Sequence, residues 1–101
     1  MDKMQQNVKS LASVYKTGDR LYYGVLRRYF SEMSEVVADS LVDNGYFRKD
    51  IICRCPKCCT AMFVKSAYEH EYGKSESFIC YNCDEAIQAD NLIEEPVLIR
   101  L

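Results

Sequence analysis

The chain has 101 residues and a mass of 11.7 kDa, enough for one compact domain but too little for a doubly wound sheet or a barrel enclosing a sizeable active site. Its composition, with 49% hydrophobic and 28% charged residues, is typical of globular proteins and argues against disorder throughout. Thirteen basic and 15 acidic residues give a formal net charge of −2. The charge of the whole molecule therefore gives no indication of binding to nucleic acid or to an acidic membrane.

The N-terminal half is predicted to be helical. A short helix ending near Thr17-Gly18 is indicated by apolar residues at helical spacing, namely Val8, Leu11, Ala12 and Tyr15. An amphipathic helix capped by Asp19 is predicted from apolar residues that recur every three or four positions: Leu21, Tyr22, Val25, Leu26, Tyr29 and Met33. A further helix is predicted to begin after Ser31; the alternative is one long helix that is only kinked at Phe30-Ser31. Asn44-Gly45 indicates that this helix ends in a left-handed backbone conformation.

Short β-prone runs follow in the C-terminal half, at residues 51–53, 61–64, 77–79 and 86–89. Residues 71–74 are interpreted as the turn region between the second and third of these runs, within a solvated loop. The aliphatic tail 97–101 is predicted to form a final strand, with Glu94-Glu95-Pro96 breaking its continuity with the preceding one. We expect the tail to be buried, either on the edge of the C-terminal sheet itself, which we favour, or on the sheet edge of a partner protein.

Six cysteines are the unusual feature of the composition. The N-terminus opens into no apolar export segment, and no stretch approaches the ~18 apolar residues of a membrane span. We therefore expect a cytoplasmic protein, or a nuclear one in a eukaryote, with no membrane partner. In a reducing compartment clustered cysteines more often bind metal than form disulfides. A redox function of a C-x-x-C pair would need a βαβ pattern, which the sequence lacks.

Two C-x-x-C pairs carry the strongest signal, Cys55-Pro56-Lys57-Cys58 and Cys80-Tyr81-Asn82-Cys83. A tight turn directs two thiolates at one metal ion, and two such turns complete a tetrahedron. A closed site of four thiolates leaves no open position for water or substrate, so the predicted metal, one Zn²⁺, is structural. We expect Cys53 and Cys59 to be non-ligating, and His70 to be a surface residue rather than a ligand. A second metal site built from these three residues is the alternative.

These residues resemble the zinc ribbon family. Residues 52–59, with proline after the first ligand, are similar to its first knuckle, and residues 78–84 to its second. The resemblance covers roughly residues 51–90. Glycine often follows the last ligand of such a knuckle, whereas this chain has Cys59 and Asp84. Aspartate tolerates a left-handed backbone better than cysteine does.

A weaker resemblance concerns the order of elements. Residues 34–47, a helix followed by Asn44-Gly45-Tyr46-Phe47, look like the last helix and turn of winged-helix proteins. A winged helix followed by a zinc ribbon is the arrangement of the alpha subunit of the general transcription factor TFIIE. We thus predict an α+β fold, in which an N-terminal segment of two or three helices packs on a small antiparallel zinc-ribbon sheet. The expected domains are a helical, degenerate winged-helix segment at 1–48 and the ribbon with its C-terminal strand at 49–101.

The sequence favours a binding protein over an enzyme. It has no glycine-rich phosphate loop and no nucleophile motif, and a single histidine, so neither catalysis nor a small-molecule substrate is expected. Arg20, Arg27 and Arg28 are candidates for nucleic-acid contact, but the predicted helix after Ser31 carries carboxylates where a recognition helix needs donors. We favour an adaptor that binds another protein subunit, in a complex that handles nucleic acid. The candidate interface residues are Tyr22, Tyr29, Val97, Leu98, Ile99 and Leu101. The alternative function is a transcriptional regulator that binds nucleic acid directly.

Overall fold

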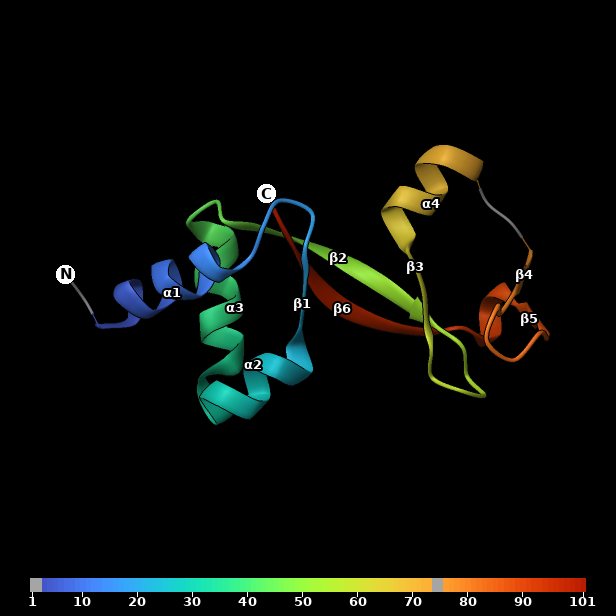
Figure 1. Ribbon diagram of the computed structural model, residues 1–101, viewed down its shortest axis with the longest axis horizontal. Coiled ribbons are helices and arrows are strands. Elements are labelled where there is room, and N and C mark those ends of the chain that lie inside the picture. Colours follow the sequence, from blue (N-terminus) through green and yellow to red (C-terminus); the bar gives the residue numbers. More distant parts are fainter. Residues whose placement is uncertain (1–2, 74–75) are drawn as a thin grey trace. The chain divides into compact units, whose positions relative to one another are not determined.

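The computed structural model describes residues 3–73 and 76–101, apart from the side chains of residues 3–5 and 70–72. The predicted α+β class is confirmed, and most of the helices are N-terminal (Figure 1). The N-terminal elements are α1 (Lys3–Val14), β1 (Arg20–Tyr22), α2 (Tyr23–Phe30), a 3-10 turn at Ser31–Met33, and α3 (Ser34–Asp43). The remaining elements are β2 (Phe47–Arg54), β3 (Ala61–Val64), α4 (Lys65–Tyr72), β4 (Ser77–Ile79), β5 (Ala86–Gln88), a 3-10 turn at Ala89–Asn91, and β6 (Ile93–Arg100).

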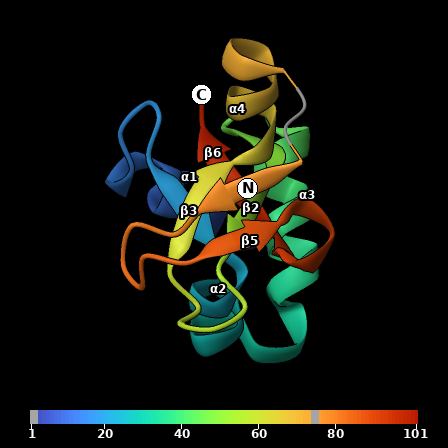
Figure 2. The ribbon, with the colours of Figure 1, turned by 90° about the vertical axis from the view of Figure 1, so that its right-hand side faces the viewer.

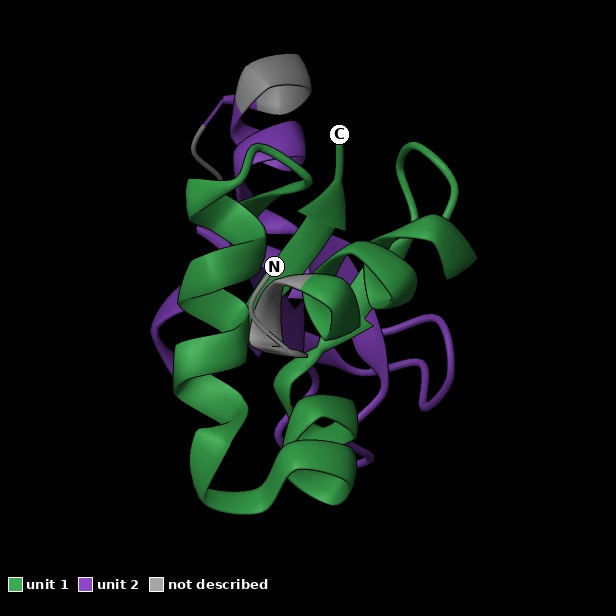
Figure 3. Cartoon of the chain, turned by 90° about the vertical axis from the view of Figure 1, so that its left-hand side faces the viewer, with its two compact units in different colours: residues 1–49, 96–101 green, residues 50–95 purple. Residues whose placement is uncertain are grey.

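The chain forms two compact units (Figure 3). Unit 1 comprises residues 1–49 together with the last six residues, 96–101, and unit 2 comprises residues 50–95. One sheet has the strand order β1-β6-β2-β3, and a separate two-stranded sheet contains β4 and β5. The unit boundaries fall within β2 and β6, so unit 2 is inserted in sequence between the parts of these strands that belong to unit 1, residues 47–49 and 96–100.

The core of unit 1 is built from all its helices and from the C-terminal strand. Each helix contributes residues of its apolar stripe, and Leu21 of β1, Phe47 of β2 and Leu98 of β6 complete the cluster. The buried members are Val8, Ala12, Leu21, Leu26, Val37, Ala38, Leu41, Phe47 and Leu98. The helical spacing of Val8 and Ala12 thus corresponds to the face that α1 buries, as the sequence indicated.

The aliphatic tail is docked within the chain. Antiparallel pairing of β6 with β1 places Leu98 opposite Leu21, and both side chains are fully buried. The Arg100 guanidinium donates hydrogen bonds from Nε to the Ala12 carbonyl at 3.1 Å and from Nη1 to the Tyr46 carbonyl at 2.8 Å. The end of the chain is therefore fixed to the last turn of α1 and to the loop after α3, as well as to β1.

Two expectations for the N-terminal half were wrong in detail. The helix predicted from Asp19 begins only at Tyr23, because Arg20–Tyr22 form β1, whose backbone pairs with the distant β6. The helix predicted after Ser31 begins at Ser34, and Ser31–Met33 form a 3-10 turn with Ser31 at a φ of 49°. The predicted stop is confirmed, since Asn44 donates from Nδ2 to the Ser40 carbonyl at 2.7 Å and Gly45 has a φ of 79°.

Unit 2 contains the four predicted strand runs. Strands β2 and β3 are antiparallel, with Cys53 opposite Phe63 and an irregularity between Cys53 and Arg54. Strands β4 and β5 form a hairpin with Phe78 opposite Ile87, as the end-on view shows (Figure 2). A solvated loop with a turn at 71–74 was expected after the second run, but the residues from Lys65 to Tyr72 form helix α4. Residues 74–75 lie outside the described part. The predicted position of the break before the tail was also wrong: residues 94–96 lie within β6, and the 3-10 turn Ala89–Asn91 separates β6 from β5.

Candidate metal centre

Each C-x-x-C pair forms a knuckle with the same backbone hydrogen bonds. In the first knuckle, the Cys59 amide donates to the Cys55 carbonyl at 2.8 Å, and the Cys55 amide donates to the Thr60 carbonyl at 3.0 Å. In the second, the Asp84 amide donates to the Cys80 carbonyl at 2.8 Å, and the Cys80 amide donates to Glu85 at 3.0 Å. The two loops are thus equivalent turns in backbone hydrogen bonding.

The residue that closes each knuckle has a left-handed backbone. Cys59 has a φ of 60° and Asp84 a φ of 55°, a region that glycine occupies without steric cost and other residues occupy rarely. These are the two positions where the zinc-ribbon pattern often has glycine. The knuckle geometry is therefore retained without glycine, at some local conformational cost.

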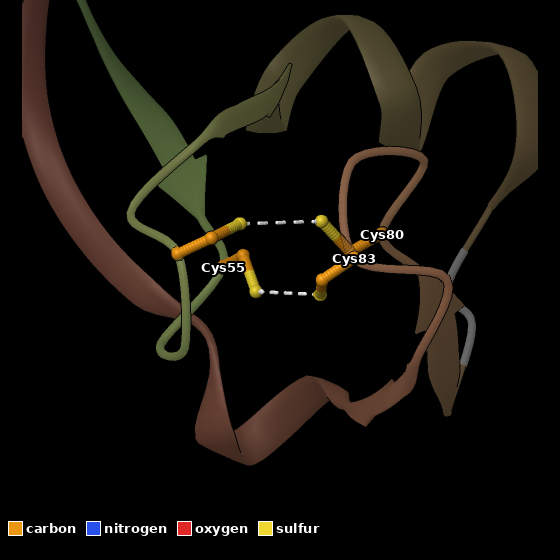
Figure 4. Close-up of side chains that lie close together, drawn as sticks. Cys55, Cys80 and Cys83 are labelled. Carbon is orange, nitrogen blue, oxygen red and sulfur yellow. Dashed lines mark hydrogen bonds between the residues drawn. The ribbon is translucent and has the colours of Figure 1, made fainter.

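The two knuckles bring four sulfur atoms together. The Sγ atoms of Cys55, Cys58, Cys80 and Cys83 all lie within 4.8 Å of one another. The Cys55 and Cys83 sulfurs are 3.7 Å apart, and the Cys58 and Cys80 sulfurs 3.6 Å apart. The labelled side chains approach one another from opposite loops (Figure 4). Four thiol groups in this arrangement could hold one metal ion, and the predicted ligand residues are the ones brought together.

The four cysteines differ in burial and pack against apolar side chains. Cys55 and Cys80 are fully buried with Ile87, and Met62 and Leu92 pack against this cluster. Cys58 and Cys83 are half-buried.

Contacts outside the sulfur cluster also link the two halves of unit 2. Lys57 of the first knuckle forms an ion pair with Glu85, which follows the second. The Tyr81 hydroxyl donates to the Ala61 carbonyl at 3.4 Å. The loops are thus held together by peripheral polar contacts in addition to the four cysteines.

The protonation of the cysteines differs within the cluster. Hydrogen bonds with Thr60 and Asn82 lower the pKa of Cys58 to about 6, and the thiol–hydroxyl bond to Thr60 is 3.2 Å long. Desolvation and hydrogen bonds with Cys80 and Cys55 raise the pKa of Cys83 to about 12. A cation bound between the sulfurs favours the thiolate form of all four, because each ligating cysteine must release its proton.

The other candidate ligands lie apart from this cluster. Cys53 is buried in β2, where burial and then the negative charge of Glu94 raise its pKa. Cys59 is exposed. In the described part of the chain, no second group of three or more metal-ligating side chains is formed. The expectation for His70 concerns a side chain outside the described part.

The other residues predicted to function are distributed over unit 1. Arg20, Arg27 and Arg28 are exposed, the last two in the final turn of α2. Tyr29 is 72% exposed, Leu101 is 52% exposed, and Tyr22 is half-buried. The other three candidate interface residues, Val97, Leu98 and Ile99, are buried in unit 1.

Among the exposed apolar residues that sequence reasoning did not single out is Val14, which is 75% exposed. Val14 lies outside the apolar stripe formed by Val8, Leu11, Ala12 and Tyr15. An apolar residue outside the buried face of a helix is a signal of an interaction surface, and this signal could have identified Val14 from the sequence. With Tyr29 it lines an apolar groove of about 510 Å³ whose other residues belong to α1 and α2.

Comparisons with protein families, with curated proteins and with solved structures found no match for this chain. Within residues 3–73 and 76–101, no helix is long and apolar enough to span a bilayer.

Proposed function

We propose that the four cysteines bind one structural Zn²⁺. A tetrahedron with metal–sulfur bonds of about 2.3 Å has edges of about 3.8 Å, and the two closest sulfur pairs, at 3.7 and 3.6 Å, fit that size. Four-sulfur tetrahedral sites also bind iron, so quantitative metal analysis is the test. One zinc per chain supports the proposal, whereas iron, or less than half an equivalent of metal, overturns it.

We further propose that the protein is a non-enzymatic adaptor, in which zinc organises unit 2 and unit 1 binds another protein subunit. The observation that carries this proposal is the apolar groove between α1 and α2. Val14 and Tyr29 are about three-quarters exposed there, and Leu11, Val25 and Phe30 complete its apolar lining. Exposed apolar surface of this kind is typical of interaction sites, and tyrosine is enriched among the residues that dominate binding energy.

The adaptor function is tested by affinity capture from native lysate with the zinc-loaded protein, in the presence of nuclease. Val14→Asp places a charge in the groove, and Ser13→Asp places the same charge on an exposed neighbouring position of α1 that does not line it. We expect a stoichiometric partner that is retained by Ser13→Asp and lost by Val14→Asp. A partner that disappears with nuclease, or that binds both variants equally, contradicts the proposal.

Direct binding of nucleic acid is the second candidate function, and the order of elements in unit 1 favours it. The elements of unit 1 follow the order α1, β1, α2, α3, β2 and β6, and β6 pairs with β1. This order resembles that of winged-helix proteins. Unit 1 also carries nine basic and six acidic residues. However, α3, which occupies the position of the recognition helix in that resemblance, exposes Glu35, Asp39 and Asp43, which would be repelled by phosphate. We therefore rank this function below the adaptor.

A further inference from the structure

Unit 2 contains a cavity of about 310 Å³ that is distinct from the cysteine cluster. Three aromatic rings line part of it: Phe63 from β3, Tyr68 from α4 and Phe78 from β4. Their centroids are 4.7, 4.8 and 5.0 Å apart. All three side chains are half-buried, so the cluster keeps ring surface that a ligand can contact.

Carboxylates line the rest of this cavity in excess over basic groups. Glu69, Asp90 and Glu94 face one basic residue, Lys65. The Lys65 ammonium is held by Glu94 at 3.0 Å, whereas Glu69 and Asp90 have no ion-pair partner among the residues that the structure describes. The acidic character extends to the whole unit, in which residues 50–95 carry four basic and nine acidic residues.

Aromatic faces beside carboxylates favour one class of ligand. A cation within about 6 Å of a ring centroid is attracted by the negative face of the ring, and the carboxylates add attraction at close range. The alkyl stem of a lysine or arginine side chain also gains from contact with the rings. An anion or a carboxylate side chain would meet repulsion from the same groups.

We propose that this cavity binds a cationic side chain, lysine or arginine, presented by a basic segment of a partner protein. The net negative charge of the surrounding unit makes it complementary to such a segment. That the occupant comes from a protein, rather than from free solute, rests on the proposed adaptor function.

The inference is tested by an NMR titration of the full-length, zinc-loaded chain with a short peptide that carries one lysine between glycines. The same peptide with acetyl-lysine removes the charge and keeps the stem. We expect shifts confined to the amides of Phe63, Tyr68, Phe78 and their neighbours, at least fivefold weaker binding of the acetylated peptide, and weaker binding at higher salt.

Two variants identify the groups responsible. The double variant Glu69→Gln/Asp90→Asn is expected to weaken lysine-peptide binding about three- to tenfold, and Phe78→Leu about two- to fivefold. Glu76→Gln removes one negative charge at an exposed residue of unit 2 outside the cavity lining and is expected to leave lysine-peptide binding unchanged.

Equal weakening in Glu76→Gln and in the double variant overturns the inference, because it indicates general charge attraction. Tight binding of tetramethylammonium, matching that of the peptide, overturns the assignment to a protein segment. The adaptor function fails on a different result, the loss of groove-dependent partner capture, so the two proposals are refuted separately.

Discussion

The substitution Leu98→Ala tests whether the C-terminal strand is part of the core of unit 1. Leu98 is fully buried, pairs opposite Leu21 and packs in the cluster that all three N-terminal helices share. Truncation of a buried leucine removes its transfer free energy and leaves a cavity, which together cost about 2–5 kcal/mol. The free energy of unfolding of a small domain is about 5–15 kcal/mol, so this one change removes a large share of it.

The assay is urea or thermal unfolding of the zinc-loaded protein, followed by circular dichroism at helix wavelengths. At about 4–8 °C per kcal/mol for a domain of this size, a loss of about 2–5 kcal/mol should lower the melting temperature by about 8–40 °C. Val14→Ala is the matched control, since its side chain is 75% exposed and surface substitutions usually change stability by less than about 0.5 kcal/mol. Zinc content should be unchanged in both variants. A loss below about 1 kcal/mol for Leu98→Ala, or a loss equal to that of Val14→Ala, refutes the reasoning.

Three further predictions concern the metal site, nucleic acid and a strained turn. Cys58→Ser should abolish stoichiometric zinc in metal analysis, whereas Cys53→Ser should retain one equivalent; zinc loss in the second variant contradicts the ligand set. Fluorescence anisotropy with duplex DNA should detect only weak, salt-sensitive association at physiological salt, because the exposed face of α3 is acidic. Submicromolar binding that is lost in Arg27→Ala/Arg28→Ala would reverse the ranking of functions. Cys59→Gly should stabilise the zinc-loaded protein by roughly 0.5–1 kcal/mol in thermal melts, because it removes the left-handed penalty at a φ of 60°; a destabilised variant contradicts this.

The sequence predicted the parts of the fold that depend on local chemistry. Asn44-Gly45 ends α3 because a glycine adopts a positive φ without cost. The C-x-x-C pairs form matching turns because their geometry is contained within a few residues. The ligand cluster was predictable for the same reason, since two such turns need only be brought face to face.

The elements that sequence reasoning missed depend on distant partners. Leu21 fits a helical pattern, but pairing with Leu98 makes it part of a strand. Glu94-Glu95-Pro96 were expected to separate the tail from the preceding strand, yet they lie within β6, which begins at Ile93. Helix α4 begins directly after β3 at Lys65 with no side-chain cap, so no local signal marked its start. The cavity beside it was equally hidden, because Phe63, Tyr68 and Phe78 converge from three elements.

Unit 2 lies in sequence between the parts of β2 and β6 that belong to unit 1, and this connection determines how loss of metal should affect unit 1. Chelation should unfold the segment Asp50–Glu95, because metal binding and folding are coupled in sites of this kind. Unit 1 would then have to close a flexible loop between its own two strands. Closure entropy grows only with the logarithm of loop length, so a loop roughly ten times longer than a tight turn costs about 2 kcal/mol more. The buried residues of unit 1, none of which is a metal ligand, should keep it folded.

We therefore expect chelator to abolish the amide dispersion of unit 2 in NMR spectra while the helical signal of unit 1 persists, with a lowered melting temperature. Complete loss of helix on chelation would show instead that unit 1 depends on the folded ribbon itself.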